Sequence, residues 1–276
     1  MSEFLRCGRF RLDLRQPVVM AIVNVTPDSF SGDGHDRHFD VALRHAERAV
    51  TDGAAILDIG GESSRPGAEP VSEQEEMDRV LPLLERIVDW EVPVSIDTVK
   101  PGVMRAAVAA GASMINDINA FQMAGALEAV AASDAALCVM HMRGKPQSMQ
   151  LDPEYSDVVV EVRDYLIRQK DRCLEAGIAA DRVTYDPGFG FGKSLAHNLA
   201  LLRALPDLVP LGPLLIGVSR KSMVGAITGR PVGQRLAGSL ATALMAADRG
   251  ASIIRVHDVG ETVDALRVRA AVLFDK

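Results

Sequence analysis

Polar and charged side chains stand at the ends of many short apolar runs in this chain. Carboxylates and amides at such positions can accept hydrogen bonds from a ligand, and an Arg two residues before a His can hold an anion such as a diphosphate. One carboxylate at a strand end is as often a structural anchor as a ligand, but several at different ends favour a binding site. The residues at the ends of the runs are Asn24, Glu62, Asp97, Asn116, Asp186, Ser219, Arg255 and His257.

The elements that must position these side chains alternate along the chain. After Gln16, eight β-rich apolar runs each lead into polar or Gly-rich residues, and helical patterns lie between them, as in 39–52, 72–90, 156–176, 232–249 and 261–274. This alternation predicts an α/β fold with a parallel sheet. The predicted strands are 18–26, 55–61, 93–98, 113–119, 136–142, 183–188, 213–219 and 253–259.

Two architectures give this local pattern, a closed (β/α)8 TIM barrel and a doubly wound open sheet. A barrel gathers all strand ends around one mouth, whereas an open sheet uses only those at a switch point. Since the unexpected polar residues follow many different runs, the barrel is the better interpretation. Residues 4–14 alternate apolar and polar around Cys7-Gly8-Arg9 and predict an N-terminal β-hairpin that closes the barrel bottom. We expect one domain over residues 1–276, because no linker or compositional break divides the chain.

The composition is that of a folded, water-soluble protein. Hydrophobic residues make up 48% and charged residues 24% of the chain, which excludes disordered and collagen-like classes. Thirty Lys and Arg against 37 Asp and Glu give a net charge of −7, so nucleic acid and anionic membranes are poor partners. Neither a signal peptide nor a transmembrane helix is expected. Three scattered cysteines without a CxxC argue against a disulfide framework and a zinc site, and favour a cytoplasmic location.

Two loop motifs follow the first two predicted strands. The chain reads Asn24-Val25-Thr26-Pro27-Asp28-Ser29-Phe30-Ser31 and then Gly60-Gly61-Glu62-Ser63-Ser64-Arg65-Pro66-Gly67. Together they resemble the loop signatures of the dihydropteroate synthase family. The resemblance continues with Ser95-Ile96-Asp97-Thr98, Ile115-Asn116-Asp117-Ile118, Met140-His141-Met142, Asp186-Pro187-Gly188-Phe189-Gly190-Phe191-Gly192-Lys193, Ser219-Arg220-Lys221-Ser222 and Arg255-Val256-His257-Asp258. Ser64 replaces the usual Thr but keeps the hydroxyl, and Ser31-Gly32-Asp33-Gly34 departs from the commoner Ser-Asp-Gly-Gly.

The resemblance implies a pterin-binding (β/α)8 barrel that joins 6-hydroxymethyl-7,8-dihydropterin pyrophosphate to para-aminobenzoate. The products would be 7,8-dihydropteroate, for folate biosynthesis, and pyrophosphate. The resemblance also implies an SN1-like loss of magnesium-bound pyrophosphate, although the residues alone leave direct displacement open. Sulfonamides are the expected competitors, and a homodimer in contact through the last helices is the expected assembly.

A pterin has a flat edge with an exocyclic amine, a ring N–H and a carbonyl oxygen, which suits carboxylate and amide acceptors beside a cation. Asp186 and Asn116 can supply the acceptors and Lys221 the donor. Asn116 and Asp117 are adjacent, so only one of them can point into the barrel, and the resemblance selects Asn116. The pterin set that the resemblance implies is Asp97, Asn116, Ile118, Met140, Asp186, Phe191, Gly217, Lys221 and Arg255.

The diphosphate requires local positive charge in this acidic chain. Arg255 and His257 are two residues apart on one predicted strand and therefore share a face, and Arg65 lies in a neighbouring loop. A lone Arg is usually a solvated charge and a lone His is usually satisfied locally, but their convergence favours an anion site. The implied pyrophosphate set is Asn24, Ser64, Arg65, Arg255 and His257, in which the amide oxygen of Asn24 would suffice as the protein ligand of Mg2+.

The para-aminobenzoate site follows from the same resemblance. The carboxylate of this substrate would be received by Ser222 and by backbone N–H groups at the start of the next helix. The implied para-aminobenzoate set is Phe30, Ser64, Pro66, Phe191, Lys221 and Ser222, and the implied catalytic set is Asp97, Arg65, Lys221, Arg255 and His257.

Two other functions are compared with the synthase. A pterin-binding methyltransferase acting with a corrinoid protein would share Asp97, Asn116 and Asp186, but it has no use for a diphosphate site. A non-catalytic pterin-binding paralogue would be expected to lack Arg65 or Lys221, and both are present. We therefore expect the synthase reaction.

Overall fold

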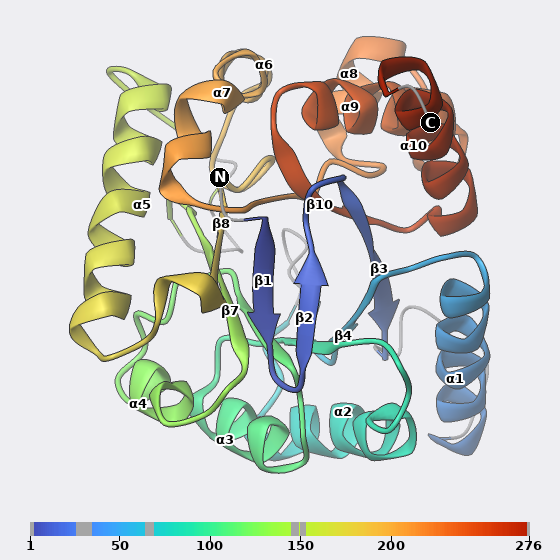
Figure 1. Cartoon of the computed structure of the whole chain (residues 1–276), viewed down its shortest axis with the longest axis vertical. Coiled ribbons are helices and arrows are strands. Elements are labelled where there is room, and N and C mark those ends of the chain that lie inside the picture. Colours follow the sequence, from blue (N-terminus) through green and yellow to red (C-terminus); the bar gives the residue numbers. More distant parts are fainter. Residues whose placement is uncertain (1–2, 26–34, 64–68, 145–148, 150–152, 275–276) are drawn as a thin grey trace.

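The computed structural model describes residues 3–25, 35–63, 69–144, 149 and 153–274. Eight parallel strands close into a barrel in the order β10-β3-β4-β5-β6-β7-β8-β9 (Figure 1). The closed ring confirms the (β/α)8 prediction against the open sheet. The strands are β3 Val18–Asn24, β4 Ile56–Gly60, β5 Val94–Asp97, β6 Met114–Asp117, β7 Ala136–Met140, β8 Val183–Asp186, β9 Leu214–Ile216 and β10 Ala251–Val256.

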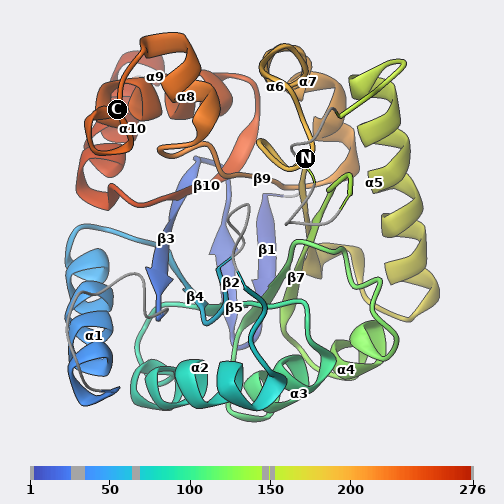
Figure 2. The same ribbon diagram turned by 180° about the vertical axis from the view of Figure 1, so that it is seen from behind.

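Helices surround the barrel on its outer side (Figure 2). Several begin at a side-chain cap: the Ser72 hydroxyl accepts a hydrogen bond from Glu75 N, and the Asp157 carboxylate accepts from Val159 N and Val160 N. The helices are α1 His35–Thr51, α2 Glu73–Ile87, α3 Pro101–Ala109, α4 Ala126–Ala131, α5 Val158–Glu175, α6 Leu195–Arg203, α7 Leu205–Leu208, α8 Ser222–Thr228, α9 Leu236–Asp248 and α10 Val259–Leu273.

Most strand residues are apolar because a barrel strand is buried on both faces. In β4, Leu57 and Ile59 belong to the core between strands and helices, together with Val80 and Leu84 of α2. Ile56 belongs instead to a separate cluster inside the barrel. The same alternation turns every second residue of a strand inward, and it therefore decides which polar side chains reach the interior.

The N-terminal hairpin is present as predicted. Its strands, β1 Phe4–Cys7 and β2 Phe10–Asp13, pair antiparallel and cross the end of the barrel (Figure 1). Leu5 and Cys7 pack on Met20 and Met114 in the cluster inside the barrel. The turn lies close to the barrel: Gly8, at φ +59, donates its N–H to Asp134 O over 3.0 Å, and a Cβ there would approach Ser113. The hairpin thus closes the end opposite the strand carboxyl ends.

Most predicted strands extend too far at their carboxyl ends. The run 113–119 keeps strand structure only over Met114–Asp117, and 213–219 only over Leu214–Ile216. The last residues of each run leave the ladder and enter the loops of the mouth. The prediction 253–259 is wrong at both ends, because Ala251 already pairs with Leu214 and Val259 begins α10.

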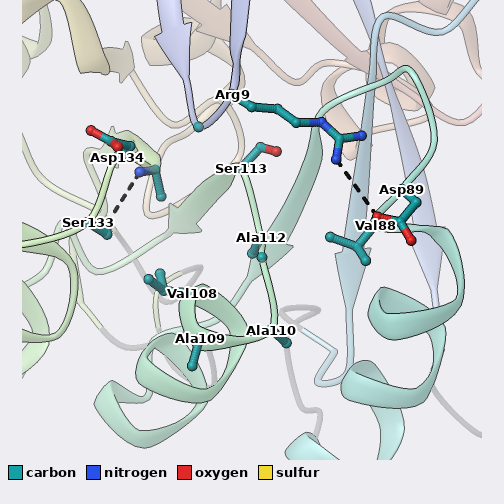
Figure 3. Close-up of a pocket in the computed structure, with 13 residues that line it drawn as sticks. Arg9, Val88, Asp89, Val108, Ala109, Ala110, Ala112, Ser113, Ser133 and Asp134 are labelled. Atoms are coloured by element: carbon teal, nitrogen blue, oxygen red, sulfur yellow. Dashed lines mark hydrogen bonds and ion pairs between the residues drawn. The ribbon is translucent and has the colours of Figure 1, made fainter.

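A pocket of about 700 Å³ lies beside the hairpin turn (Figure 3). Small side chains and backbone of residues 108–113 line it with Arg9 and Asp134. Arg9 Nη2 donates to Trp90 O over 2.7 Å. The pocket lies before β6 and β7 begin, so it is separate from the strand carboxyl ends.

The three cysteines are free and buried in different places. Cys7 lies in the hairpin, Cys138 on β7 inside the barrel, and Cys173 on α5. Among the helices that the structure describes, none is long and apolar enough to cross a membrane.

Candidate active site

The barrel mouth brings together polar residues from neighbouring strands. Asn24 pairs in register with Gly60, Gly60 with Asp97, and Asp97 with Asn116. Gly60 leaves room between its neighbours, since a Cβ there would lie 3.6 Å from Asn24 Oδ1 and 3.8 Å from Asp97 Cβ. Gly60 therefore lies at contact distance from both Asn24 and Asp97.

Arg255 links two carboxylates inside this mouth. Its Nε donates to Asp58 Oδ2 over 2.6 Å and its Nη2 to Asp97 Oδ2 over 2.7 Å. The Asp58 side chain is fully buried, whereas the Asp97 side chain is 16% exposed. Burial raises the pKa of Asp97 to about 7, although the charge of Arg255 opposes the rise. The Asp97 carboxyl is therefore protonated more readily than an ordinary aspartate.

Asn116 points into the barrel and Asp117 points out of it, as the alternation requires. Asn116 Nδ2 donates to Asp58 Oδ2 over 3.1 Å. The Asp117 carboxylate instead accepts from Asn119 N at 2.6 Å and Phe121 N at 2.7 Å, which holds the turn after β6. The choice of Asn116 as the inward residue is confirmed.

Asp186, the last residue of β8, and Lys221, directly before α8, both lie at the mouth and interact electrostatically. Asp186 Oδ1 accepts from Gly188 N over 2.7 Å, and Lys221 Nζ donates to Phe189 O over 2.5 Å. Burial lowers the pKa of Lys221 to about 8 against the attraction of Asp186. Burial also raises the pKa of Asp186, and Lys221 opposes that rise. The two residues are a buried acceptor and a half-buried donor.

The Gly-rich loop after β8 is fixed by a buried lysine. Lys193 Nζ contacts Gly188 O at 2.9 Å, Phe191 O at 3.0 Å and the Nδ1 atom of His141 at 3.0 Å. The loop presents the Phe191 ring to Lys221, whose Nζ lies 4.8 Å from the ring centroid. Lys193 thereby sets the position of one wall of the mouth.

The other residues of the predicted sets that the structure describes lie around the same mouth. Met140 pairs in register with Asp186, and Ile118 is buried directly after β6. A Cβ at Gly217 would lie 3.7 Å from Lys221 Nζ and 3.9 Å from Arg255 Cβ, so this glycine leaves space between two cations. Ser222 opens α8 and is exposed.

His257 lies one residue beyond β10, so it continues from the strand of Arg255 without being part of it. Its backbone N donates to Ser219 Oγ over 3.3 Å, and its Nδ1 lies 3.1 Å from the same oxygen. The hydroxyl of Ser219 therefore positions His257 at the mouth.

Comparison with known proteins places this arrangement in a family. A family model described as "Pterin binding enzyme" matches residues 20–257. The dihydropteroate synthase of Escherichia coli (strain K12) is 51% identical over 267 residues, which cover 96% of this chain and 95% of that protein. The chain belongs to the dihydropteroate synthase family. It is accordingly an enzyme of the transferase class, and the predicted family membership is confirmed.

Solved dihydropteroate synthase structures share the fold. The Xanthomonas albilineans enzyme with 4-aminobenzoic acid has a TM-score of 0.93 and 51% identity, covering 99% of this chain and 98% of that one. The Burkholderia cenocepacia enzyme with 7,8-dihydropteroate has a TM-score of 0.89 and 52% identity, covering 98% and 96%. The Yersinia pestis enzyme in a sulfonamide drug complex has a TM-score of 0.93 and 49% identity, covering 98% of both chains.

Four residues of the expected dihydropteroate synthase site, Phe30, Ser64, Arg65 and Pro66, lie outside the described residues. The chain on both sides of 64–68 is held firmly. Glu62 Oε2 accepts from Val71 N over 3.3 Å and pairs with Lys100, which also pairs with the buried Glu76. Arg79 Nη1 donates to Gly61 O over 2.8 Å.

Sequence reasoning missed Asp58 and Lys193. Asp58 stands in the middle of the apolar strand Ile56–Gly60 rather than at its end, where functional residues of a barrel are sought. Its signal was present nevertheless, because a lone carboxylate in an apolar run requires a buried partner. Lys193 closes the Gly-rich motif, and nothing in the sequence indicates that it points inward.

Proposed function

We propose that this member of the family condenses 6-hydroxymethyl-7,8-dihydropterin pyrophosphate with para-aminobenzoate to give 7,8-dihydropteroate and pyrophosphate. The observation that carries the proposal is the set of the buried Asp186 and Asn116 with the half-buried Lys221, whose charge interacts with Asp186, because these acceptors and this donor match the edge of a pterin. The related structures with 4-aminobenzoic acid and with 7,8-dihydropteroate support both substrates.

In this proposal Asp186 accepts from the exocyclic amine and ring N–H of the pterin, and Asn116 supplies a further acceptor. Lys221 donates to the carbonyl oxygen and a ring nitrogen. Ile118 and Met140 are buried and apolar, so they provide the flat walls that an aromatic ring system requires. The Phe191 ring covers the open side.

The leaving pyrophosphate is assigned to Asn24, Ser64, Arg65, Arg255 and His257. Arg255 already spans Asp58 and Asp97, so its guanidinium reaches the mouth with a fixed direction. His257 can donate to an anion from the ring nitrogen that does not face Ser219. These groups would stabilise the negative charge that develops as the leaving group departs.

Magnesium is the proposed cofactor. The part of the chain that the structure describes contains no cluster of three or more His, Cys, Asp and Glu side chains that could hold a metal alone. A phosphate-bound magnesium ion does not require one, because it keeps several waters and takes few protein ligands. The amide oxygen of Asn24, at the mouth beside Gly60, fits that requirement. When bound, the ion would neutralise phosphate charge.

We propose an SN1-like route for the carbon centre. The amine of para-aminobenzoate is neutral at pH 7, so no strong base is needed to prepare it. The harder step is loss of pyrophosphate from the methylene group, which leaves positive charge on the pterin. Asp97, when ionised, would favour that charge from the opposite side of the mouth.

Para-aminobenzoate is assigned to Phe30, Ser64, Pro66, Phe191, Lys221 and Ser222. Ser222 is the first residue of α8, so its backbone N–H and hydroxyl can meet a carboxylate at the helix start. Sulfonamides should compete for this position, as the sulfonamide complex of the Yersinia pestis relative supports.

We also propose a homodimer and a cytoplasmic location. Large apolar side chains are exposed on the last helices and are typical of a subunit contact: Ile227 on α8, Met245 on α9, and Val268 and Val272 on α10. The three unpaired thiols support a reducing compartment.

The decisive test is turnover of the purified chain with both substrates and Mg2+. Dihydropteroate and pyrophosphate should form in equal amounts, and Asp186→Ala should bind 6-hydroxymethylpterin at least tenfold more weakly by calorimetry. Methyl transfer from a methylated folate to a corrinoid protein, without condensation, would indicate the methyltransferase. Pterin binding without either reaction would indicate a binding paralogue.

A further inference from the structure

Asp58 lies inside the barrel, one inward-facing position below Gly60 on β4. Its buried Oδ2 accepts from Asn116 Nδ2 at 3.1 Å and from Arg255 Nε at 2.6 Å. Both donors belong to the pterin set that the family resemblance implies, and they come from β6 and β10. Arg255 is assigned to the pyrophosphate as well. One carboxylate below the mouth thus holds two side chains from opposite parts of the ring.

The contact with Asp58 decides which way the Asn116 amide faces. An amide presents an oxygen acceptor at one end and a nitrogen donor at the other, whereas an ionised carboxylate can only accept. Nδ2 is therefore held at Asp58, and Oδ1 lies at the other end of the amide. A rotated amide would set oxygen against oxygen and lose the hydrogen bond. The acceptor that a pterin N–H requires is thus fixed before any ligand binds.

The same carboxylate fixes the Arg255 guanidinium. With Nε on Asp58 and Nη2 on Asp97, both the position and the plane of the group are set. Asp58 is the more buried of the two carboxylates, so it anchors Arg255 from the side away from the mouth.

We propose that Asp58 is a positioning residue of the pterin pocket, which orients Asn116 and Arg255 for the ligand without contacting it. This inference rests on the proposed function. The effect should fall on the pterin and not on para-aminobenzoate, because no hydrogen bond joins Asp58 to Phe191, Lys221 or Ser222, the described members of the para-aminobenzoate set.

The first test is Asp58→Asn, which keeps the shape but removes the charge and one acceptor. We expect at least tenfold weaker binding of 6-hydroxymethylpterin by calorimetry and at least a tenfold higher KM for the pterin substrate. The KM for para-aminobenzoate should change less than twofold. The matched control is Ser95→Ala, opposite Asp58 on β5 and equally buried, whose hydroxyl has no hydrogen-bond partner among the described residues. It should leave both values within twofold.

The second test exchanges the residues at positions 58 and 116. It remains informative even if Asp58→Asn alone is unstable. Asn116→Asp sets two carboxylates against each other and should weaken pterin binding more than tenfold. Adding Asp58→Asn restores a donor between positions 58 and 116 and keeps the total charge, so the double variant should bind at least threefold more tightly than Asn116→Asp. Circular dichroism and thermal unfolding confirm that each variant is folded.

The outcomes separate this role from the proposed function. No pterin binding by the wild-type chain would refute both. Wild-type binding that is unchanged in Asp58→Asn refutes the role of Asp58 alone. The role is also refuted if the double variant binds no better than Asn116→Asp, or if KM rises equally for both substrates.

Discussion

Lys193 Nζ lies 3.0 Å from Nδ1 of His141, so two basic side chains contact each other in the protein interior. Burial lowers the pKa of Lys193 to about 7, and in its ammonium form this lysine can only donate, so Nδ1 is then the acceptor of a neutral imidazole. Burial, together with the charge of Lys193, lowers the pKa of His141 to about 3. The contact is therefore compatible with neutral pH.

His141→Gln should reduce the acid sensitivity of the fold. The unfolded chain takes up a proton at this histidine below about pH 6.5, whereas the folded chain does not until about pH 3. Stability is therefore present above pH 6.5 and lost as the pH falls towards 3, by about 2 kcal/mol between pH 7 and pH 5. Guanidinium unfolding at these two pH values should show a smaller decline in the variant. An equal decline in both proteins would contradict the assignment.

Lys193→Met should destabilise the protein by about 3 kcal/mol, since the carbonyls of Phe191 and Gly188 lose a charged donor, although Gly188 O keeps the hydrogen bond from Phe191 N. Lys170→Met is the control, because Lys170 is half-buried and, among the described residues, donates one hydrogen bond, to Leu211 O. We expect a loss below about 1 kcal/mol there. Guanidinium unfolding would measure the loss of unfolding free energy. Similar losses in the two variants would contradict the claim that the buried Lys193 stabilises the loop.

The fold could be predicted because barrel strands are buried on both faces and so read as short apolar runs between helical patterns. The strand ends could not be predicted, since the sequence does not show that the strands already end at Asp117 and Ile216, before Asn119 and Ser219. The short helices α3, α4 and α8 begin directly after Lys100, Gly125 and Lys221. None of these residues caps its helix with a side-chain hydrogen bond, so the sequence has no capping signal for where these helices begin.

The site was predictable where residues end strands, as with Asp97, Asn116 and Asp186. It was not predictable where partners are remote in sequence. Asp58 contacts Arg255, which is 197 residues away in the sequence, and Lys193 contacts His141, which is 52 residues away. Only the closed ring brings these pairs together, and no local pattern encodes them.

Asp97→Asn should remove the rise of kcat/KM with pH on the acidic side of the pH profile. Because the pKa of Asp97 is raised to about 7, the carboxylate forms as the pH rises through 7, and kcat/KM should rise with it to a plateau. The variant should be about 100-fold slower and show no such rise. Asp117→Asn is the control: burial also raises the pKa of Asp117 to about 7, but this residue faces away from the mouth. A rise that disappears in Asp117→Asn instead would contradict the assignment.

Lys100→Met should cost about 3 kcal/mol of unfolding free energy, because Glu76, with 1% of its side chain exposed, loses its counter-charge. The double variant Lys100→Met/Glu76→Gln should recover part of that loss. Glu73→Gln, which weakens only the contact of Glu73 with Gly102 N, should change stability by no more than about 0.5 kcal/mol. Urea unfolding would measure all three, and a double variant no more stable than Lys100→Met would contradict the pairing.

The three buried cysteines can serve as probes of local opening in three different parts of the structure. Burial raises the pKa of Cys7 to about 12 and of Cys173 to about 11, and it raises that of Cys138 well above its ordinary value. Only a thiolate reacts with an alkylating reagent, so each buried thiol should remain unlabelled until the structure around it opens locally. The labelling rate of Cys7 should therefore report how often the hairpin separates from the barrel. The rate of Cys173 should report separation of α5, and the rate of Cys138 should report opening of the barrel.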